Sequence, residues 1–108
     1  MNNSLEMKQI AKLEQKITLQ VNNFLVLSEL GNPTQIALAY KSAQNEFLNL
    51  GPEMHRISEK IGGELPNYVA DFLESIDSVL HNEGIIDEEI ITHCLSSSAK
   101  LKAELSRL

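Results

Sequence analysis

Apolar residues recur every three or four positions near both ends of the chain, which is the spacing of one face of an α-helix. One series covers residues 10–27 and the other covers residues 91–108. Laid antiparallel, the two series pair as Ile10–Leu108, Leu13–Leu105, Ile17–Leu101, Gln20–Ser98, Phe24–Cys94 and Leu27–Ile91. The polar positions of the two series meet, and the largest ring meets the small thiol. The pattern therefore predicts a helical bundle whose first and last helices are antiparallel neighbours.

Breaks in this pattern separate the first helix from a second one. The first helix is expected over residues 5–30, because Gly31 is of the residue type that most often ends a helix. Asn32 and Pro33 then favour a new start, since asparagine caps a first turn and proline fits its first position. The second helix is expected to reach Leu50, with one apolar face.

A glycine and a proline then interrupt the second helix. Gly51-Pro52 is expected to break or kink it, because proline lacks the amide hydrogen that a helix interior needs. Residues 53–61 are expected to form a short extra helix, which must lean on its neighbours because a helix of this length is marginal alone. Gly62 and Gly63 are expected to end it.

The last part of the chain predicts two further helices. Pro66 is expected to open the first of them, and Gly84 to close it. Asp87 is a suitable cap for the last helix, and Glu88 and Glu89 in its first turn suit the positive end of the helix dipole. No segment alternates apolar and polar residues as a strand would.

These elements predict one all-α domain over residues 1–108. Its expected architecture is an up-down antiparallel four-helix bundle, with the short extra helix in the connection between the second and third long helices. A rival interpretation places the series over residues 10–27 in a parallel homodimer, so that the last helix packs elsewhere.

Charge narrows the range of partners. The chain has a net charge of −6, and residues 63–90 hold eight carboxylates and no Lys or Arg. Nucleic acid and anionic membranes both require cationic contacts, so neither is expected as a partner. A basic protein surface is favoured instead. The alternative is an acidic face that only keeps the protein in solution.

Cysteine content and hydropathy predict an intracellular, soluble protein of the cytoplasm or the nucleus. Cys94 is the single cysteine, which excludes an internal disulfide and fits a reducing compartment. Charged residues interrupt the first twenty positions, so no apolar segment typical of a secretory signal is found there. No apolar run is long enough to cross a bilayer.

His55 is the residue with the clearest chemical potential. The stretch over residues 54–62 resembles the motif of histidine phosphotransfer domains, which are four-helix bundles of this size with one exposed histidine. That family places a lysine and a glycine directly after His-x-x, whereas here Ser58 and Glu59 hold these positions. Lys60 comes fifth after the histidine. The glutamate would stand about one helical turn from a phosphoryl group and repel it.

Two acid–histidine pairs at a spacing of four residues give a second chemical alternative. Asp77 and His81 form one pair, and Glu89 and His93 form the other. Two such pairs could converge on a metal ion, although this spacing also describes an ordinary ion pair along a helix. We find no motif for catalysis and no phosphate-binding glycine loop, so no enzyme activity, resident metal or cofactor is expected.

The favoured function is therefore a non-catalytic protein–protein interaction module, such as a small subunit, adaptor or dedicated chaperone. Its partner is expected to be a protein with a basic or amphipathic helical surface, with a homodimer as one possibility. Apolar residues of the short extra helix and the acidic residues after it are expected to form the interface. These are Met54, Ile57, Ile61, Glu64, Asp71, Glu74 and Asp77. A histidine phosphotransfer-like or metal-binding bundle is the alternative.

Overall fold

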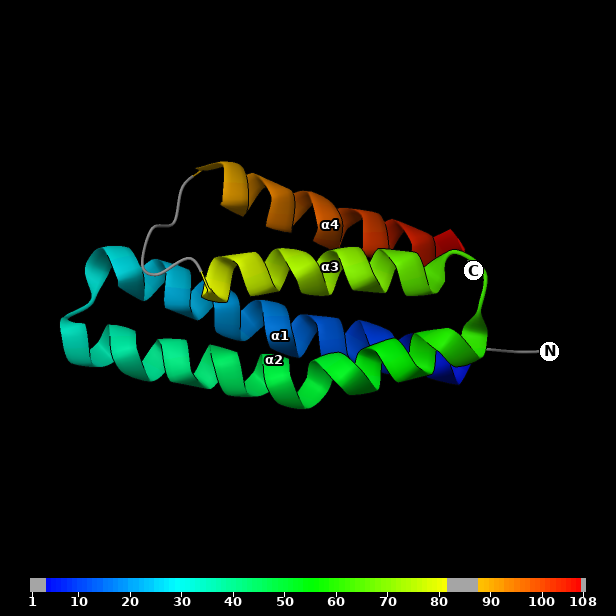
Figure 1. Cartoon of the computed structure of the whole chain (residues 1–108), viewed down its shortest axis with the longest axis horizontal. Helices are drawn as coiled ribbons and strands as arrows, with labels where there is room; N and C mark the ends of the chain where they lie inside the picture. The colour runs from blue at the N-terminus through cyan, green and yellow to red at the C-terminus, as the bar shows by residue number, and fades with distance from the viewer. Residues whose placement is uncertain (1–3, 82–87, 108) are drawn as a thin grey trace.

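The computed structural model describes residues 4–81 and 88–107. This part of the chain forms the helices α1 (Ser4–Leu30), α2 (Pro33–Ile61), α3 (Leu65–Leu80) and α4 (Glu88–Arg107), without a strand. The helices lie side by side along one long axis (Figure 1). The prediction of an all-α helical bundle is confirmed. None of the described helices combines the length and apolarity needed to cross a membrane.

The turn between α1 and α2 follows from local sequence alone. The Gly31 amide donates to the carbonyl of Leu27 at 2.7 Å and closes the last turn of α1. The Asn32 side chain accepts a hydrogen bond from the Gln35 amide at 2.9 Å, and the Gln35 side chain accepts one from the Asn32 amide at 3.1 Å. This reciprocal capping satisfies amides that a helix start leaves free. The predicted helix end and restart are both confirmed.

The predicted short extra helix is wrong, because α2 runs through Gly51-Pro52 without interruption to Ile61. Figure 1 shows α2 bending near its middle, which is the usual effect of an internal proline. Gly51 has no Cβ, so it avoids the clash that keeps most residues before proline out of the helical conformation. Met54 and Ile57 are buried in the core, and their packing stabilises the turns that follow.

The connection from α2 to α3 is built on two glycines in left-handed conformations. Gly62 has φ of 81° and Gly63 has φ of 63°, which confirms the predicted helix end. Helix α3 then starts at Leu65, one residue before the predicted opening proline. The predicted stop at Gly84 and the predicted cap at Asp87 lie outside the described residues.

The core is supplied mainly by α1, α2 and α3. Its buried apolar residues are Ile10, Ile17, Val21, Phe24, Ala39, Ala43, Met54, Ile57, Leu65, Val69, Phe72, Ile76, Val79, Leu80 and Leu101. Helix α4 contributes one of these, together with the buried hydroxyl side chains of Ser97 and Ser98. It packs mainly on α3, whereas α1 packs mainly on α2. The last helix is therefore the one held least by apolar burial.

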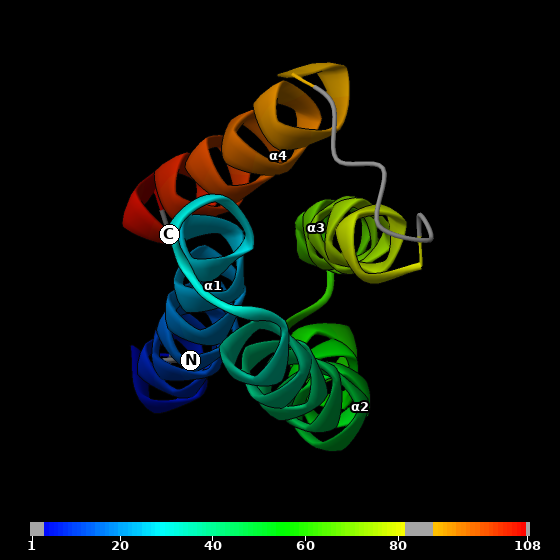
Figure 2. The same cartoon turned by 90° about the vertical axis from the view of Figure 1, so that its left-hand side faces the viewer.

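The first and last helices touch as predicted, but in a different register. The Ser98 hydroxyl donates to a carboxylate oxygen of Glu14 at 2.6 Å, so the partner of Ser98 is Glu14 and not Gln20. Figure 2 shows α4 crossing α1 obliquely, with its N-terminal end turned away. The contact is consequently concentrated near Ser98 and does not extend along the whole predicted series. The predicted pair Ile10–Leu108 includes a residue outside the described part.

The rival parallel homodimer through the series over residues 10–27 is disfavoured by burial. Ile10, Ile17 and Phe24 are buried inside one chain, with exposed fractions of 0%, 0% and 6%. Phe24 packs edge-on against Tyr40 of α2, with ring centroids 5.4 Å apart. This apolar face of α1 is already used by its own chain, so a dimer through it would require the bundle to open.

Candidate functional site

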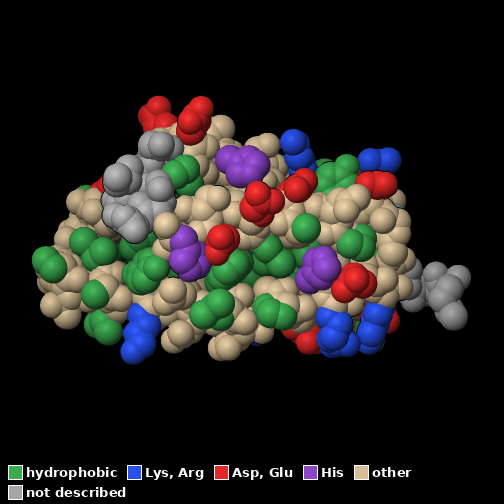
Figure 3. Space-filling view, viewed as in Figure 1, with side chains coloured by type: hydrophobic (Ala, Val, Ile, Leu, Met, Phe, Trp, Pro, Cys, Tyr) green, Lys and Arg blue, Asp and Glu red, His purple; other side chains and the backbone are tan. Residues whose placement is uncertain are grey.

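An apolar groove lies between α2 and α3 on the face shown in Figure 3. Its hollow measures about 350 Å³ and is lined by Phe47, Leu48, Gly51, Pro52, His55 and Leu73. We call these six residues the α2–α3 groove. Leu48 stands at its edge with 58% of its surface exposed. An apolar hollow with an exposed leucine is typical of a surface that accepts an apolar side chain from a partner.

A glycine stands at the floor of the groove, where α2 passes α3. A Cβ added to Gly51 would lie 3.4 Å from a methyl group of Leu73 and 4.0 Å from the ring of Phe47. The added Cβ would make ordinary van der Waals contacts there, so the absence of a side chain leaves the floor of the groove open but is not what allows the helices to approach. Pro52 next to it also leaves a helix carbonyl without its usual donor, so the groove lies at the bend of α2.

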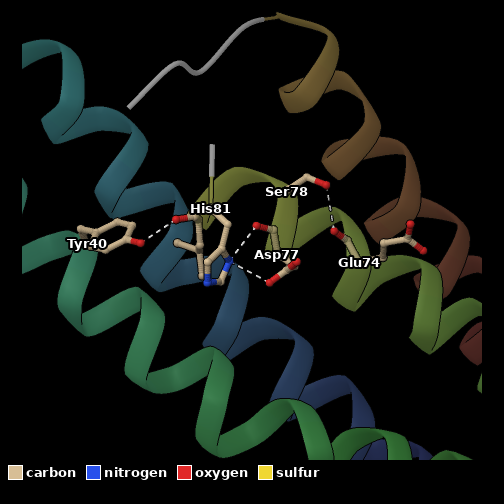
Figure 4. Close-up of polar contacts among 6 residues, drawn as sticks. Tyr40, Glu74, Asp77, Ser78 and His81 are labelled. Atoms are coloured by element: carbon tan, nitrogen blue, oxygen red, sulfur yellow. Dashed lines mark hydrogen bonds and ion pairs between the residues drawn. The ribbon is translucent and has the colours of Figure 1, made fainter. Parts of the chain in front are cut away.

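A second hollow of about 420 Å³ lies at the other end of the α2–α3 boundary. It is lined by Phe24, Pro33, Ile36, Ala37, Tyr40, Val79 and Leu80. The Tyr40 hydroxyl donates to the carbonyl of Leu80 at 2.6 Å, a contact drawn in Figure 4. This bond satisfies a carbonyl of the last turn of α3 and ties that turn to α2.

Carboxylates follow the outer side of α3, the helix that contributes Leu73 to the groove. Asp71, Glu74 and Asp77 are all exposed, and α3 contains no Lys or Arg. Glu64 precedes the helix and is exposed too, although its side chain makes no capping bond. Figure 3 shows acidic side chains next to the hydrophobic ones along this boundary. We call Asp71, Glu74 and Asp77 the acidic rim.

Two histidines stand near the groove and the rim, and each contacts a carboxylate of its own helix. His81 Nδ1 lies 2.7 Å from Asp77 Oδ1, and His55 Nδ1 lies 3.3 Å from Glu59 Oε1 (Figure 4 draws the first pair). Both are pairs at a spacing of four residues, as expected of ordinary helix ion pairs. The carboxylate of Glu59 lies where it would repel a phosphoryl group on His55, as the sequence indicated.

The other acid–histidine pair, Glu89 and His93, lies on α4 and is exposed. Two pairs on different helices would have to converge to bind a metal. Within residues 4–81 and 88–107, no group of three or more His, Cys, Asp or Glu side chains is arranged to hold a metal ion.

The structure divides the predicted interface residues into two sets. Met54 and Ile57 are buried and Ile61 is partly buried, because they belong to the continuous α2 and pack inward. These apolar residues therefore pack inside the chain, and Met54 and Ile57 are not available to a partner. The acidic residues are exposed, and the apolar lining of the α2–α3 groove is not among the residues predicted from the sequence. The signal for this lining in the sequence is the pair of large apolar residues Phe47 and Leu48 just before Gly51-Pro52.

A buried carboxylate between α1 and α4 is a second unusual feature. Glu14 is 1% exposed, and its Oε1 accepts hydrogen bonds from Ser98 at 2.6 Å and Thr18 at 3.3 Å. Lys102 Nζ lies 3.6 Å from the same oxygen, while 59% of its side chain is exposed. A buried charge is costly unless it is paired and hydrogen-bonded, and these three contacts supply that compensation.

Cys94 lies close to this polar cluster, on the wall of a hollow of about 260 Å³ between α1 and α4. Burial raises the pKa of its thiol, a hydrogen bond with Ser75 lowers it, and the nearby charge of Glu14 raises it further. The net effect is a raised pKa, so the thiol is protonated and poorly nucleophilic at neutral pH. This geometry describes a structural cysteine and not a reactive one.

No family model matches the chain, and neither a curated protein nor a solved structure matches it. Function is therefore inferred from the α2–α3 groove, the acidic rim and the distribution of charge.

Proposed function

We propose that the chain is a non-catalytic protein-interaction module. The α2–α3 groove receives one or two apolar side chains of an amphipathic partner helix, and the acidic rim pairs with the basic residues of that helix. The observation that supports this proposal is the position of exposed Leu48 over an apolar hollow, directly beside a helix with three exposed carboxylates and no cation.

The up-down antiparallel topology is part of this proposal. Its support is the alternation of helix directions that the colours of Figure 1 follow from α1 to α4, together with the short connections after Leu30 and Ile61. In this topology α2 and α3 are joined by a tight glycine turn. The groove between them is then fixed by the core on one side and open to solvent on the other.

The groove and the rim have separate energetic roles. Burying one Leu or Phe side chain of the partner contributes about 1.5–3 kcal/mol, which makes the hollow the main source of affinity. Exposed ion pairs contribute less, about 0–1 kcal/mol each, but they speed encounter and reject acidic partners. Binding is therefore expected to weaken with salt and to depend most on the apolar anchor.

Two exposed leucines of α2 provide a matched test. Leu48 lines the groove, whereas Leu38, 63% exposed, lies outside both hollows on α2. The probe is a fluorescent helical peptide with leucines on one face and lysines on the other, titrated by anisotropy. We expect Leu48→Glu to weaken binding at least tenfold, which is about 1.4 kcal/mol, and Leu38→Glu to leave it unchanged.

A peptide whose lysines are replaced by glutamine tests the acidic rim. We expect it to bind more weakly and with less dependence on salt. Equal losses from Leu48→Glu and Leu38→Glu would contradict a specific groove, because they would show general attraction to any exposed apolar position of α2.

A further inference from the structure

The outer side of α1 carries an exposed stripe of apolar and basic residues. Its members repeat at helical spacing over eight positions: Leu5, Lys8, Lys12, Lys16, Leu19, Asn23, Val26 and Leu30. We call these residues the α1 outer face. All of them are exposed, and Leu19, Val26 and Leu30 are 66%, 55% and 82% exposed. Burial of the core on the opposite side of α1 does not explain so many exposed large aliphatic side chains on one helix face.

The α1 outer face has the chemistry that the α2–α3 groove requires of a partner. It is an amphipathic helix surface with three ammonium groups and no carboxylate. The groove is mostly apolar, and α3 beside it carries three exposed carboxylates and no Lys or Arg. The apolar part of the stripe, residues 19–30, spans about 17 Å, and the sixteen residues of α3 span about 24 Å, so the lengths are compatible.

The two surfaces lie on opposite sides of the bundle. Figure 2 places α1 on one side and α3 on the other, and Figure 1 shows α1 behind the pair formed by α2 and α3. One copy therefore cannot place its own α1 outer face in its own groove. A contact between them requires a second copy.

From these observations, and building on the proposed function, we propose that a second copy of this chain occupies the groove. The α1 outer face of one copy docks on the α2–α3 groove of the next, with Leu19 or Val26 in the hollow and the lysines on the acidic rim. Such a contact joins two different patches, so each added copy leaves one groove and one α1 outer face free.

Charge favours this arrangement over a parallel dimer of two α1 outer faces. Parallel pairing of two such faces would set Lys8, Lys12 and Lys16 against their own counterparts, and like charges at close range are unfavourable. Pairing with the acidic rim replaces this repulsion with attraction. The association is consequently expected to weaken as salt screens the charges.

Two variants separate this contact from other forms of self-association. Leu48→Glu disables the groove and leaves the α1 outer face intact. Leu19→Glu with Val26→Glu disables the α1 outer face and leaves the groove intact. All three positions are exposed, so circular dichroism should show unchanged helix content. Leu38→Glu is the matched control and should associate like the parent.

Sedimentation velocity over a range of concentrations gives the decisive result. We expect the parent chain to form larger species as concentration rises, each variant alone to stay monomeric, and an equimolar mixture of the two variants to form a 1:1 complex. The complex follows because each variant keeps the surface that the other lacks. Higher salt should weaken both associations.

Other outcomes would overturn the self-docking contact. A parent chain that stays monomeric while the leucine–lysine peptide still binds the groove would refute it and leave the proposed function standing. Association that survives Leu48→Glu but not the α1 variant would indicate paired α1 faces instead. A mixture of variants that remains monomeric, although the parent associates, would refute it as well.

Discussion

Glu14 shows how a single residue can set the register of two helices. Its carboxylate lies between α1 and α4 and meets Ser98, Thr18 and Lys102 at one oxygen. A buried carboxylate without partners destabilises the fold by more than its hydrogen bonds stabilise it when they are formed. Registers of α4 that separate Ser98 from Glu14 are therefore disfavoured. The burial of Glu14 could not be predicted from the sequence, because glutamate is usually exposed and its partner Ser98 is 84 residues away.

Removing the hydroxyl of Ser98 tests this role. Ser98→Ala takes away the shortest hydrogen bond of a buried carboxylate, and we expect the free energy of unfolding to fall by about 1–3 kcal/mol. The same change at the exposed Ser96 is the control and should have little effect. Urea unfolding of both variants measures the difference. An unchanged Ser98→Ala variant would show that Glu14 is satisfied without α4.

Because of Cys94, the free energy of unfolding is expected to depend on pH in the alkaline range. Because burial raises the pKa of this thiol in the folded state, the unfolded chain loses its proton first as pH rises. The contribution of the protonated thiol is complete below the unfolded pKa of about 8.5 and is lost above it. We expect the stability difference between the parent and Cys94→Ala to shrink between neutral pH and about pH 9.5. A difference that grows over this range would contradict a raised pKa.

Helix α2 shows where local and tertiary signals disagree. Gly31, Asn32 and Pro33 acted as the sequence predicts, because capping needs only residues a few positions apart. Gly51-Pro52 did not end the helix, because the burial of Met54 beyond it depends on contacts with other helices. A proline in a helix interior costs about 3 kcal/mol, so packing must offset that amount.

Replacing this proline tests the balance directly. Pro52→Ala restores an amide that can donate to the carbonyl of Leu48, and we expect the free energy of unfolding to rise by up to about 3 kcal/mol. Chemical denaturation followed by circular dichroism measures it. A less stable variant would show that the bend itself is required to bring Met54 and Ile57 into the core.

At the scale of the whole molecule, the sequence was sufficient for the helical class and for contact between the first and last helices. The sequence was not sufficient to predict the α2–α3 groove. Leu48 and Leu73 belong to different helices and are 25 positions apart, and Gly51, which also lines the groove, was expected only to help break or kink the helix. The acidic residues could be selected because charge is visible in a sequence, whereas the shape of the surface beside them is not.

In the folded bundle, positive and negative side chains are separated in space. Cations on the α1 outer face and carboxylates on the acidic rim lie on opposite sides, whereas the sequence shows only where charges fall along the chain. A surface of this kind orients an approaching partner before contact. The same polarity would orient a second copy.

Mapping of the bound peptide by NMR tests the central claim most directly. Amide chemical shifts of the Leu19→Glu/Val26→Glu chain would be followed during titration with the leucine–lysine helical peptide, so that self-docking does not compete. We predict that the largest changes fall on residues 47–55 of α2 and 70–77 of α3. Changes confined to α1 and α4, or spread evenly over the bundle, would contradict the assignment of the α2–α3 groove as the binding site.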